Sequence, residues 1–502
     1  MVAFMTVLIV VFTVVFTILG AARKAEGCFV VVAGCDASAT GRVLVGHNED
    51  NRGELIMRHR YFPPASGGRP LFFEDGSAAV QRPDRSLGFF WTETLRPAPG
   101  ESFGDSFVNE LGVAVFSNTC CLSREDSPEL VDGGIGWGLR RLVAERARSA
   151  RDAVRIASDL VLTYGYLGSG RSYTFADSGE AWVFQVVNGK HFAARRVPDD
   201  HVTVNPNHYS IREIDPDDPD NCLVSPGLVE YAIKRGWYSP RRPGCYDDFD
   251  FAGVFQHPDY VTVPLNEPRR SFGLAAAAGV GIDLGKSGTR PPFSVRPAEP
   301  LTFSTVHRTL SCHCERPEDS DERDGALCGA PHAGGGILDG ENRRDEYTRI
   351  CNGSNRESVI VEMSENPDET TIWSCFGNPC VLPMTPWRLG ARAVPESFSG
   401  ATGIVEDEGA ATRRHFGASR QDLEREAPEA WSVSRALVER CDADYPKRSI
   451  EVREALRSVL REIWESDKNF ESSFPHNRES FFLNASSQAG LVVNAIRSLI
   501  EE

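Results

Sequence analysis

An apolar segment at the start of the chain decides where its folded part can begin. Residues 3–22 are almost wholly apolar, and charge begins abruptly at Arg23 and Lys24. An apolar run of this length is either the core of a signal peptide or a membrane anchor. We expect residues 1–22 to be a cleaved signal peptide and residues 23–27 a short propeptide. Retention of the segment as an anchor is the alternative.

Cys28 follows these segments, and its exposure at a new N-terminus would create a complete catalytic unit. Cleavage after Ala22 would leave the propeptide, whereas cleavage after Gly27 would release Cys28 directly. Lipid attachment at Cys28 is a third interpretation. An N-terminal cysteine carries a thiol nucleophile, and its α-amine can take the thiol proton and return it to a leaving amine. The sequence therefore makes Cys28 a candidate nucleophile.

Composition indicates a globular protein and disfavours anionic partners. The chain has 502 residues and a formal net charge of −17, so a nucleic acid or an anionic membrane surface is an unfavourable partner. The length allows one to three domains. Because no clean linker interrupts the chain, we expect a single domain over residues 28–502. Small peptides are the expected partners, no stable membrane partner is expected once the leader is removed, and self-association into a homo-oligomer stays open.

The 13 cysteines are many for a cytosolic enzyme and favour an oxidising compartment. The twelve besides Cys28 could form up to six disulfide bridges. Asn352-Gly-Ser and Asn484-Ala-Ser are glycosylation sequons. We therefore expect a secreted protein or one in the lumen of lysosomes or other endomembranes, with anchoring by the N-terminal segment as the alternative.

Metal binding is not expected from the spacing of cysteines and histidines. The candidates are the Cys-His-Cys triplet 312–314 with Cys328 and His332, and Cys375 with Cys380. Neither has the C-x2-C pairing that is usual in zinc sites. A cysteine nucleophile also needs no organic cofactor, so the expected enzyme contains neither.

The hydrophobic pattern predicts antiparallel sheets covered by helices. Runs of β-branched residues between turn residues indicate strands, and apolar residues three or four apart indicate helices. Strands are expected at 29–33, 43–47, 201–204, 358–363 and 370–374, with strand-turn-strand units at 107–115 and 173–187. Helices are expected at 135–148, 149–164, 228–235 and within a helical C-terminal part, 429–470, at 429–442 and 450–465. Three segments are expected to be irregular: 264–300, an insertion around 310–340, and a proline-rich crossing at 381–388.

Six stretches match one protein family in order. They are Cys28 with GHNED at 46–50, VNELGVAVFSNT at 108–119, LRRLVAERARSARDAV at 139–154, TFADSGEAWVFQV at 174–186, PDDHVTVNPNHYSIREID at 198–215 and WSCFGNPCVLPMTPWR at 373–388. With these stretches the chain resembles the dipeptidase/secernin family of cysteine N-terminal-nucleophile hydrolases. The resemblance implies an α+β fold, the αββα sandwich of two antiparallel sheets between helical layers. It also implies autoprocessing that exposes the cysteine and hydrolysis of short peptides, mainly dipeptides.

The resemblance further implies roles for five residues. Cys28 would be the nucleophile and, through its α-amine, the base, and Asp50 would orient that amine. Asn207 would donate to the oxyanion, with Asn118 as a second donor, and Arg270 would support the nucleophile. Neighbouring residues compete for the last three positions, namely Asn205, Thr119 and Arg269. His47 stands where related acylases often carry arginine, and it is left outside the catalytic set.

Two other functions stay open at this stage. The same chemistry could serve an amidase for N-acyl substrates, as in bile-salt hydrolases, penicillin V acylase and ceramidase-type amidases. The chain could also be a non-catalytic secernin-like protein in secretion, which predicts an intact leader and an internal Cys28.

Overall fold

The structure is a computed structural model that describes most of the chain after the leader. The described residues are 28–51, 53–67, 70, 77–95, 106–119, 121–258, 266–281, 290–313, 349–400, 418–444, 447–473 and 476–501. The predicted signal peptide, the propeptide and most of the predicted insertion around 310–340 lie outside these residues.

The first sheet has six strands in the order β12-β1-β2-β14-β15-β16, and each neighbouring pair is antiparallel. Its strands are β1 (Phe29–Ala33), β2 (Leu44–Asp50), β12 (Val202–Asn205), β14 (Asn355–Glu362), β15 (Thr371–Cys375) and β16 (Thr385–Arg388). The predicted hairpin of 29–33 with 43–47 is confirmed as β1 and β2, which lie inside the sheet with partners on both sides.

The second sheet has eight strands in the order β13-β11-β10-β9-β8-β7-β6-β3. Its strands are β3 (Ile56–Phe62), β6 (Phe89–Leu95), β7 (Phe107–Asn109), β8 (Ala114–Thr119), β9 (Arg171–Ala176), β10 (Ala181–Val186), β11 (Phe192–Arg196) and β13 (Cys222–Val224). A small separate ribbon pairs β4 (Ala65–Ser66) with β5 (Arg85–Ser86). The strand-turn-strand predictions at 107–115 and 173–187 are confirmed as β7–β8 and β9–β10.

Side chains that alternate along the strands join the two sheets face to face. Val30 and Val32 of β1 and Val45 of β2 share one buried core with Phe116 of β8 and Val183 of β10. Successive side chains of a strand point to opposite faces, so the alternate residues of β1 must be covered from the other side. The sheets therefore form the inner two layers of the molecule.

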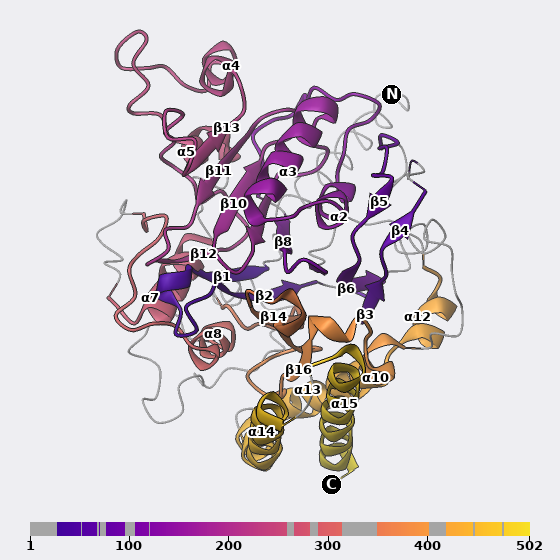
Figure 1. The fold of residues 1–502 in the computed structure, drawn as a ribbon. Coiled ribbons are helices and arrows are strands. Elements are labelled where there is room, and N and C mark those ends of the chain that lie inside the picture. Colours follow the sequence, from indigo (N-terminus) through magenta and orange to yellow (C-terminus); the bar gives the residue numbers. More distant parts are fainter. Residues whose placement is uncertain are drawn as a thin grey trace, which may run out of the picture.

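Helices cover the outer face of each sheet (Figure 1). The helices α7 (Asn266–Ala278) and α8 (Phe303–Leu310) contact the first sheet, and α2 (Gly138–Ala144) and α3 (Ala150–Tyr164) contact the second. Phe29 and Val31 of β1 pack in a core that includes Leu274 of α7 and Val306 of α8. The layers are therefore helix, sheet, sheet, helix, and the predicted αββα sandwich is confirmed.

Two glycines let the helices approach the first sheet closely. A Cβ atom on Gly46 of β2 would lie 2.4 Å from the Val306 side chain of α8, and one on Gly273 of α7 would lie 2.3 Å from the Phe29 ring. Both distances are far below van der Waals contact, so these positions have no room for a side chain. The close packing brings α7 next to the end of β1 where Cys28 lies.

The C-terminal helices form a separate layer beside the first sheet (Figure 1). They are α10 (Glu396–Ser399), α12 (Arg420–Glu426), α13 (Glu429–Ala443), α14 (Lys447–Ser473) and α15 (Arg478–Glu501), and α15 contacts β16. The predicted helices at 429–442 and 450–465 are confirmed as α13 and α14, while α15 was not predicted. Shorter helical segments are α4 (Leu228–Lys234), α5 (Phe251–Phe255), Cys35–Ala37, Pro367–Glu369 and Leu389–Ala391.

Two segments expected to be irregular contain regular elements, and several strands were not expected. The predicted irregular segment 264–300 contains α7, whose Pro268 lies in the first turn, where the backbone N–H groups have no partner within the helix. The proline-rich crossing at 381–388 contains β16, which tolerates Pro386 because it is an edge strand. The strands missed from the sequence include β11, β13, β3 and β6. In β3 and β6 the polar residues Arg58 and Glu93 pair with each other in the interior.

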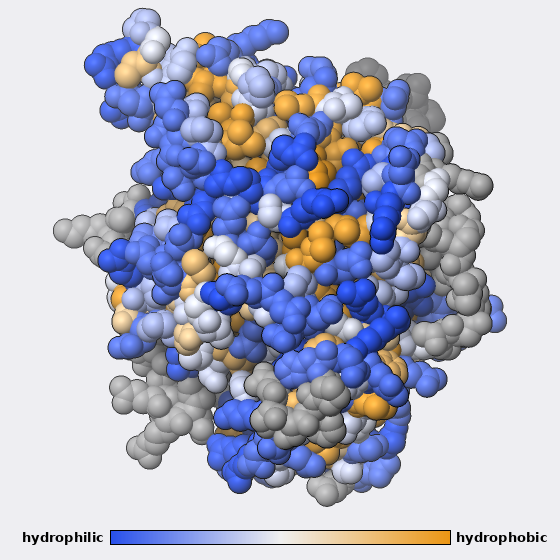
Figure 2. Space-filling model, in the orientation of Figure 1, coloured by the Kyte–Doolittle hydropathy of each residue, from blue (hydrophilic) through white to orange (hydrophobic). Residues whose placement is uncertain are grey.

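Three observations on the described residues concern the expected oxidising compartment. Hydrophilic side chains dominate the face shown in Figure 2, with apolar ones in small groups between them. Within the described ranges, no helix has both the length and the apolar composition needed to cross a bilayer. Cys35, Cys222, Cys245, Cys375 and Cys441 are free thiols, so the twelve cysteines besides Cys28 do not form six bridges.

Candidate active site

Cys28 lies at the start of β1, in the interior. The strand β1 has β2 on one side and β12 on the other. Its side chain is only 2% exposed. Phe29 pairs with Asn48 of β2, so Cys28 stands opposite Glu49. On the other side Val30 pairs with Asn205, the last residue of β12, so this strand ends beside the start of β1, and Asn207 follows two residues later. The sheet thus brings together three segments that are far apart in the sequence.

The carboxylate of Glu49 contacts the thiol of Cys28. The Cys28 Sγ atom donates to Glu49 Oε1 at 3.8 Å, and Asn51 Nδ2 donates to the same oxygen at 2.5 Å. Glu49 Oε2 lies 3.9 Å from His47 Nε2, and the other ring nitrogen of His47 is 3.2 Å from Ser106 Oγ of the second sheet. All of these side chains are buried. Sequence reasoning missed Glu49, although it belongs to the same GHNED stretch as Asp50.

The surroundings of the thiol favour its protonated form. Burial raises the pKa of Cys28 well above its ordinary value, and the nearby Glu49 and Asp50 carboxylates raise it further. A hydrogen bond from the Asp50 backbone and the charge of Arg171 act in the opposite direction. In the chain in which Gly27 still precedes Cys28, the residue is therefore held as a thiol, which is the less reactive form.

Asp50 is held by a cation and an amide on the helical side of β2. Arg269 of α7 lies 3.5 Å from Asp50 Oδ2, and Asn352 Nδ2 donates to the same oxygen at 2.7 Å. The Arg269 guanidinium also stacks over the Phe29 ring at 5.5 Å. These contacts orient the Asp50 carboxylate beside the first residues of β1.

Arg270, the predicted supporting arginine, has a different environment from its neighbour. Its guanidinium donates to the backbone oxygens of Pro291, at 2.9 Å, and Pro292, at 2.5 Å. Burial lowers the pKa of Arg270 to about 10, against the opposing charge of Glu267. Arg269 therefore contacts Asp50, whereas Arg270 links α7 to the segment that follows it.

The three asparagines of the prediction are all buried near the end of β12. Asn207 is 0% exposed and lies two residues beyond the strand. Asn118 Nδ2 donates to the backbone oxygen of Asn205, a bond that joins β8 of the second sheet to β12 of the first. The Asn205 side chain accepts from Ser210 Oγ at 2.6 Å. Asn207 and Asn118 therefore lie in one region on the β12 side of Cys28.

His208 and Glu267 link this region to α7. His208 Nε2 is 3.5 Å from Glu267 Oε1. Burial by itself would raise the pKa of Glu267, but the hydrogen bond with His208 and the charges of Arg270 and Arg290 lower it to about 2. Burial lowers the pKa of His208. This pair was also missed from the sequence, since the two residues are distant and only the packing of α7 brings them together.

Asn352, in one of the two predicted glycosylation sites, makes a hydrogen bond inside the protein. The Asn352 side chain is partly buried and donates to Asp50, so it does not serve as an exposed glycan acceptor in this structure. Asn484 lies within α15 and is half-buried. The sequons therefore give little support to the expectation of a glycoprotein.

The comparisons with known proteins agree on one group. The sequence profile described as Peptidase family C69 matches residues 27–410. A "Probable dipeptidase" of Latilactobacillus sakei is 23% identical over 381 residues, which are 74% of this chain and 76% of the relative. A "Dipeptidase" of Bifidobacterium longum is 23% identical over 489 residues, 88% of this chain and 87% of the relative.

Among solved structures, a mutant conjugated bile acid hydrolase from Clostridium perfringens matches with a TM-score of 0.30 and 9% identity, over 72% of this chain and 92% of that chain. The score is low, and the fold assignment rests on the sheet order and packing described above.

Proposed function

The chain belongs to peptidase family C69, and from that membership we propose that it is a cysteine dipeptidase that acts through Cys28 as an N-terminal nucleophile. The observation that best supports this proposal is the position of Cys28, which is buried at the start of β1 with Glu49 opposite it. A strand start inside a sheet holds the backbone nitrogen and the side chain of one residue in fixed relation. That is the requirement of a mechanism in which both groups react.

The proposed reaction begins with removal of the segment before Cys28. The new α-amine, whose ordinary pKa is about 8, takes the proton of the thiol. The thiolate attacks the peptide carbonyl carbon, and the amine then gives the proton to the leaving amino group. Water hydrolyses the thioester, which releases the N-terminal part of the substrate and restores Cys28.

The neighbouring side chains would divide two further tasks. Asp50, held by Arg269 and Asn352, would accept a hydrogen bond from the α-amine and stabilise its charged form. Asn207 and Asn118 would donate to the oxyanion of the tetrahedral intermediate. Arg270 would act indirectly, because its bonds to Pro291 and Pro292 fix the helix that carries Arg269.

Removal of the leader also implies a location. Residues 1–22 would direct the chain into the secretory pathway as a signal peptide, and the mature enzyme would be secreted or reside in a lysosomal or other endomembrane lumen. The apolar composition of residues 3–22 supports this proposal. Retention of the segment would instead give an anchored protein in which Cys28 is internal.

Activity on defined substrates tests the proposed function. The mature protein is assayed with dipeptides that have a free α-amine, with the same dipeptides acylated at that amine, and with longer peptides. Faster hydrolysis of free dipeptides supports a dipeptidase, and exclusive cleavage of the N-acyl bond would identify an amidase instead. Cys28→Ser should abolish or severely slow turnover. Cys35→Ser, which removes another free thiol seven residues later, is the matched control and should retain activity.

A further inference from the structure

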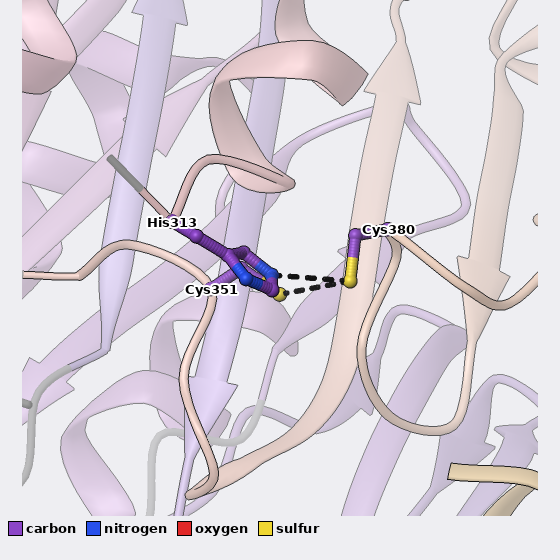
Figure 3. Close-up of side chains that lie close together, drawn as sticks. All are labelled: His313, Cys351 and Cys380. Carbon is purple, nitrogen blue, oxygen red and sulfur yellow. Dashed lines mark hydrogen bonds between the residues drawn. The ribbon is translucent and has the colours of Figure 1, made fainter. Parts of the chain in front are cut away.

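Two thiols and an imidazole meet in the interior behind the candidate active site. His313 Nε2 lies 3.2 Å from Cys380 Sγ, and the sulfurs of Cys351 and Cys380 are 3.6 Å apart. All three residues are buried, and their ligand atoms lie within 4.8 Å of one another. Figure 3 shows the three side chains pointing toward one another from separate segments: after α8, before β14 and after β15.

These separations are close to those of a tetrahedral zinc site. Zinc bonds of about 2.3 Å to sulfur and about 2.0 Å to nitrogen, at tetrahedral angles, place two sulfurs about 3.8 Å apart and a sulfur and a nitrogen about 3.5 Å apart. The separations of 3.6 Å and 3.2 Å differ from these values by a few tenths of an ångström. A disulfide would need the sulfurs at about 2.05 Å.

We propose that His313, Cys351 and Cys380 bind a Zn²⁺ ion. Thiolate and imidazole together select zinc over the hard cations Mg²⁺ and Ca²⁺. On binding, each thiol loses its proton, and the two thiolate charges balance the charge of the ion. Three protein ligands leave one tetrahedral position of the ion for a further ligand.

A surrounding hydrogen bond supports this assignment. Asn378 Nδ2 donates to Cys351 Sγ at 3.3 Å and to the backbone oxygen of Asn352 at 2.8 Å. An N–H group directed at a ligand sulfur stabilises the thiolate and fixes its position, as outer-shell groups do at metal sites. Asn378 is 1% exposed, so solvent does not compete for this bond.

The ion would hold the segment that supports Asp50. Cys351 is followed directly by Asn352, which donates to Asp50, and the Cys351 N–H donates to the backbone oxygen of Cys312 at 2.9 Å. Coordination would thus join the end of α8 to the start of the segment leading into β14. Cross-links between residues far apart in sequence restrict the unfolded chain most, so the ion would also stabilise the fold.

Metal content tests the proposal without reference to peptidase activity. The full chain, expressed with zinc in the medium and dialysed against metal-free buffer, is analysed by elemental mass spectrometry. One zinc per chain is expected. Cys351→Ser and Cys380→Ser should each lower zinc affinity about 100-fold or more, measured by competition with a chromogenic chelator. Cys441→Ser, a free thiol in the same core cluster, should keep the wild-type affinity.

Cys28→Ser distinguishes this site from a metal at the candidate active site, where Cys28, His47 and Glu49 also lie within 4.8 Å of one another. Unchanged zinc content in Cys28→Ser supports the proposal, and loss of the metal there overturns it.

Cobalt loading of the wild-type protein is a second test, which does not depend on the folding of any variant. Sulfur-to-cobalt charge-transfer absorption with tetrahedral d–d bands supports the site. Absence of bound metal, or a Cys351–Cys380 disulfide in freshly purified protein, contradicts it.

Discussion

Arg269 lies 3.5 Å from Asp50, and both side chains are buried beside the first residue of β1. A buried carboxylate needs a charged or hydrogen-bonding partner, and here the partner comes from a helix that packs against Phe29. The candidate active site and the outer helical layer are therefore packed together as one structural unit.

Asp50→Asn should lower kcat of the mature enzyme by about 10²–10⁴-fold, because an amide orients the α-amine poorly and does not stabilise its charged form. Substrate affinity should change much less, since the role concerns the base. Steady-state kinetics on a dipeptide check this. Asp36→Asn, which changes an exposed carboxylate just after β1, at the other end of the hairpin, is the control. Wild-type kcat in Asp50→Asn would remove Asp50 from the mechanism.

The two adjacent arginines should respond differently to substitution. Arg269→Ala should reduce kcat strongly, whereas Arg270→Ala should chiefly destabilise the protein, by about 2–3 kcal/mol, because two backbone oxygens lose their donor. Chemical denaturation and kinetics on both variants separate the effects. If Arg270→Ala loses kcat at full stability and Arg269→Ala does not, the assignment of the two residues is reversed.

Asn207→Ala should lower kcat by about 10²–10³-fold, the usual effect of removing one oxyanion donor. Asn118→Ala should have a smaller effect, because the Asn118 amide already donates to the backbone of Asn205. Turnover of one dipeptide by the two variants, compared with Asn205→Ala, ranks the three asparagines. A larger loss in Asn205→Ala than in Asn207→Ala would shift the donor role to Asn205.

Glu267→Gln should destabilise the protein by about 1–3 kcal/mol at neutral pH, through loss of a buried carboxylate that lies beside His208 and the positive charge of Arg270. The folded-state pKa of Glu267, about 2, is below its ordinary value of 4.5. The contribution of the carboxylate is therefore present above pH 4.5 and is lost as the pH falls toward 2. Unfolding free energies of the two proteins should converge over that interval. A difference that stays constant with pH would show that the charge of Glu267 does not contribute to stability.

Cys28 should react slowly with iodoacetamide in the chain that retains Gly27 and faster once it is N-terminal. Burial and two carboxylates raise the pKa of the internal thiol, so the thiolate fraction at neutral pH is small. The labelling rate of the unprocessed chain should rise steadily with pH well above 8. Peptide mass spectrometry after timed labelling measures it. Equal rates at neutral pH in both forms would contradict the role of the new amine.

The sequence predicts more of the fold than of the site. The β1–β2 hairpin, β9, β10, β14 and β15 follow from runs of alternating or β-branched residues, and α3 follows from its apolar spacing. The predictions failed where local signals conflict with packing. The segments that form α7 and β16 contain prolines, so they were expected to be irregular. The charged residues Arg58 and Glu93 interrupt the apolar pattern of β3 and β6, so these strands were not predicted.

The candidate site shows the same limit. Cys28 and Asp50 were found because they lie in a recognisable order on one hairpin. Glu49 could have been found from strand register alone, since it stands opposite Cys28. The contacts of Asp50 with Arg269 and Asn352, and the grouping of His313 with Cys351 and Cys380, depend on segments that the tertiary fold brings together.

The identity of the first residue in active protein tests the central claim most directly. Material purified from a eukaryotic secretory host is fractionated, and each fraction is analysed by intact mass and N-terminal peptide sequencing beside its dipeptidase activity. We predict that active chains begin at Cys28 and that activity rises in proportion to their share. Full activity in chains that begin at Met1 or Arg23 would contradict the account, because no free α-amine would then stand beside the thiol.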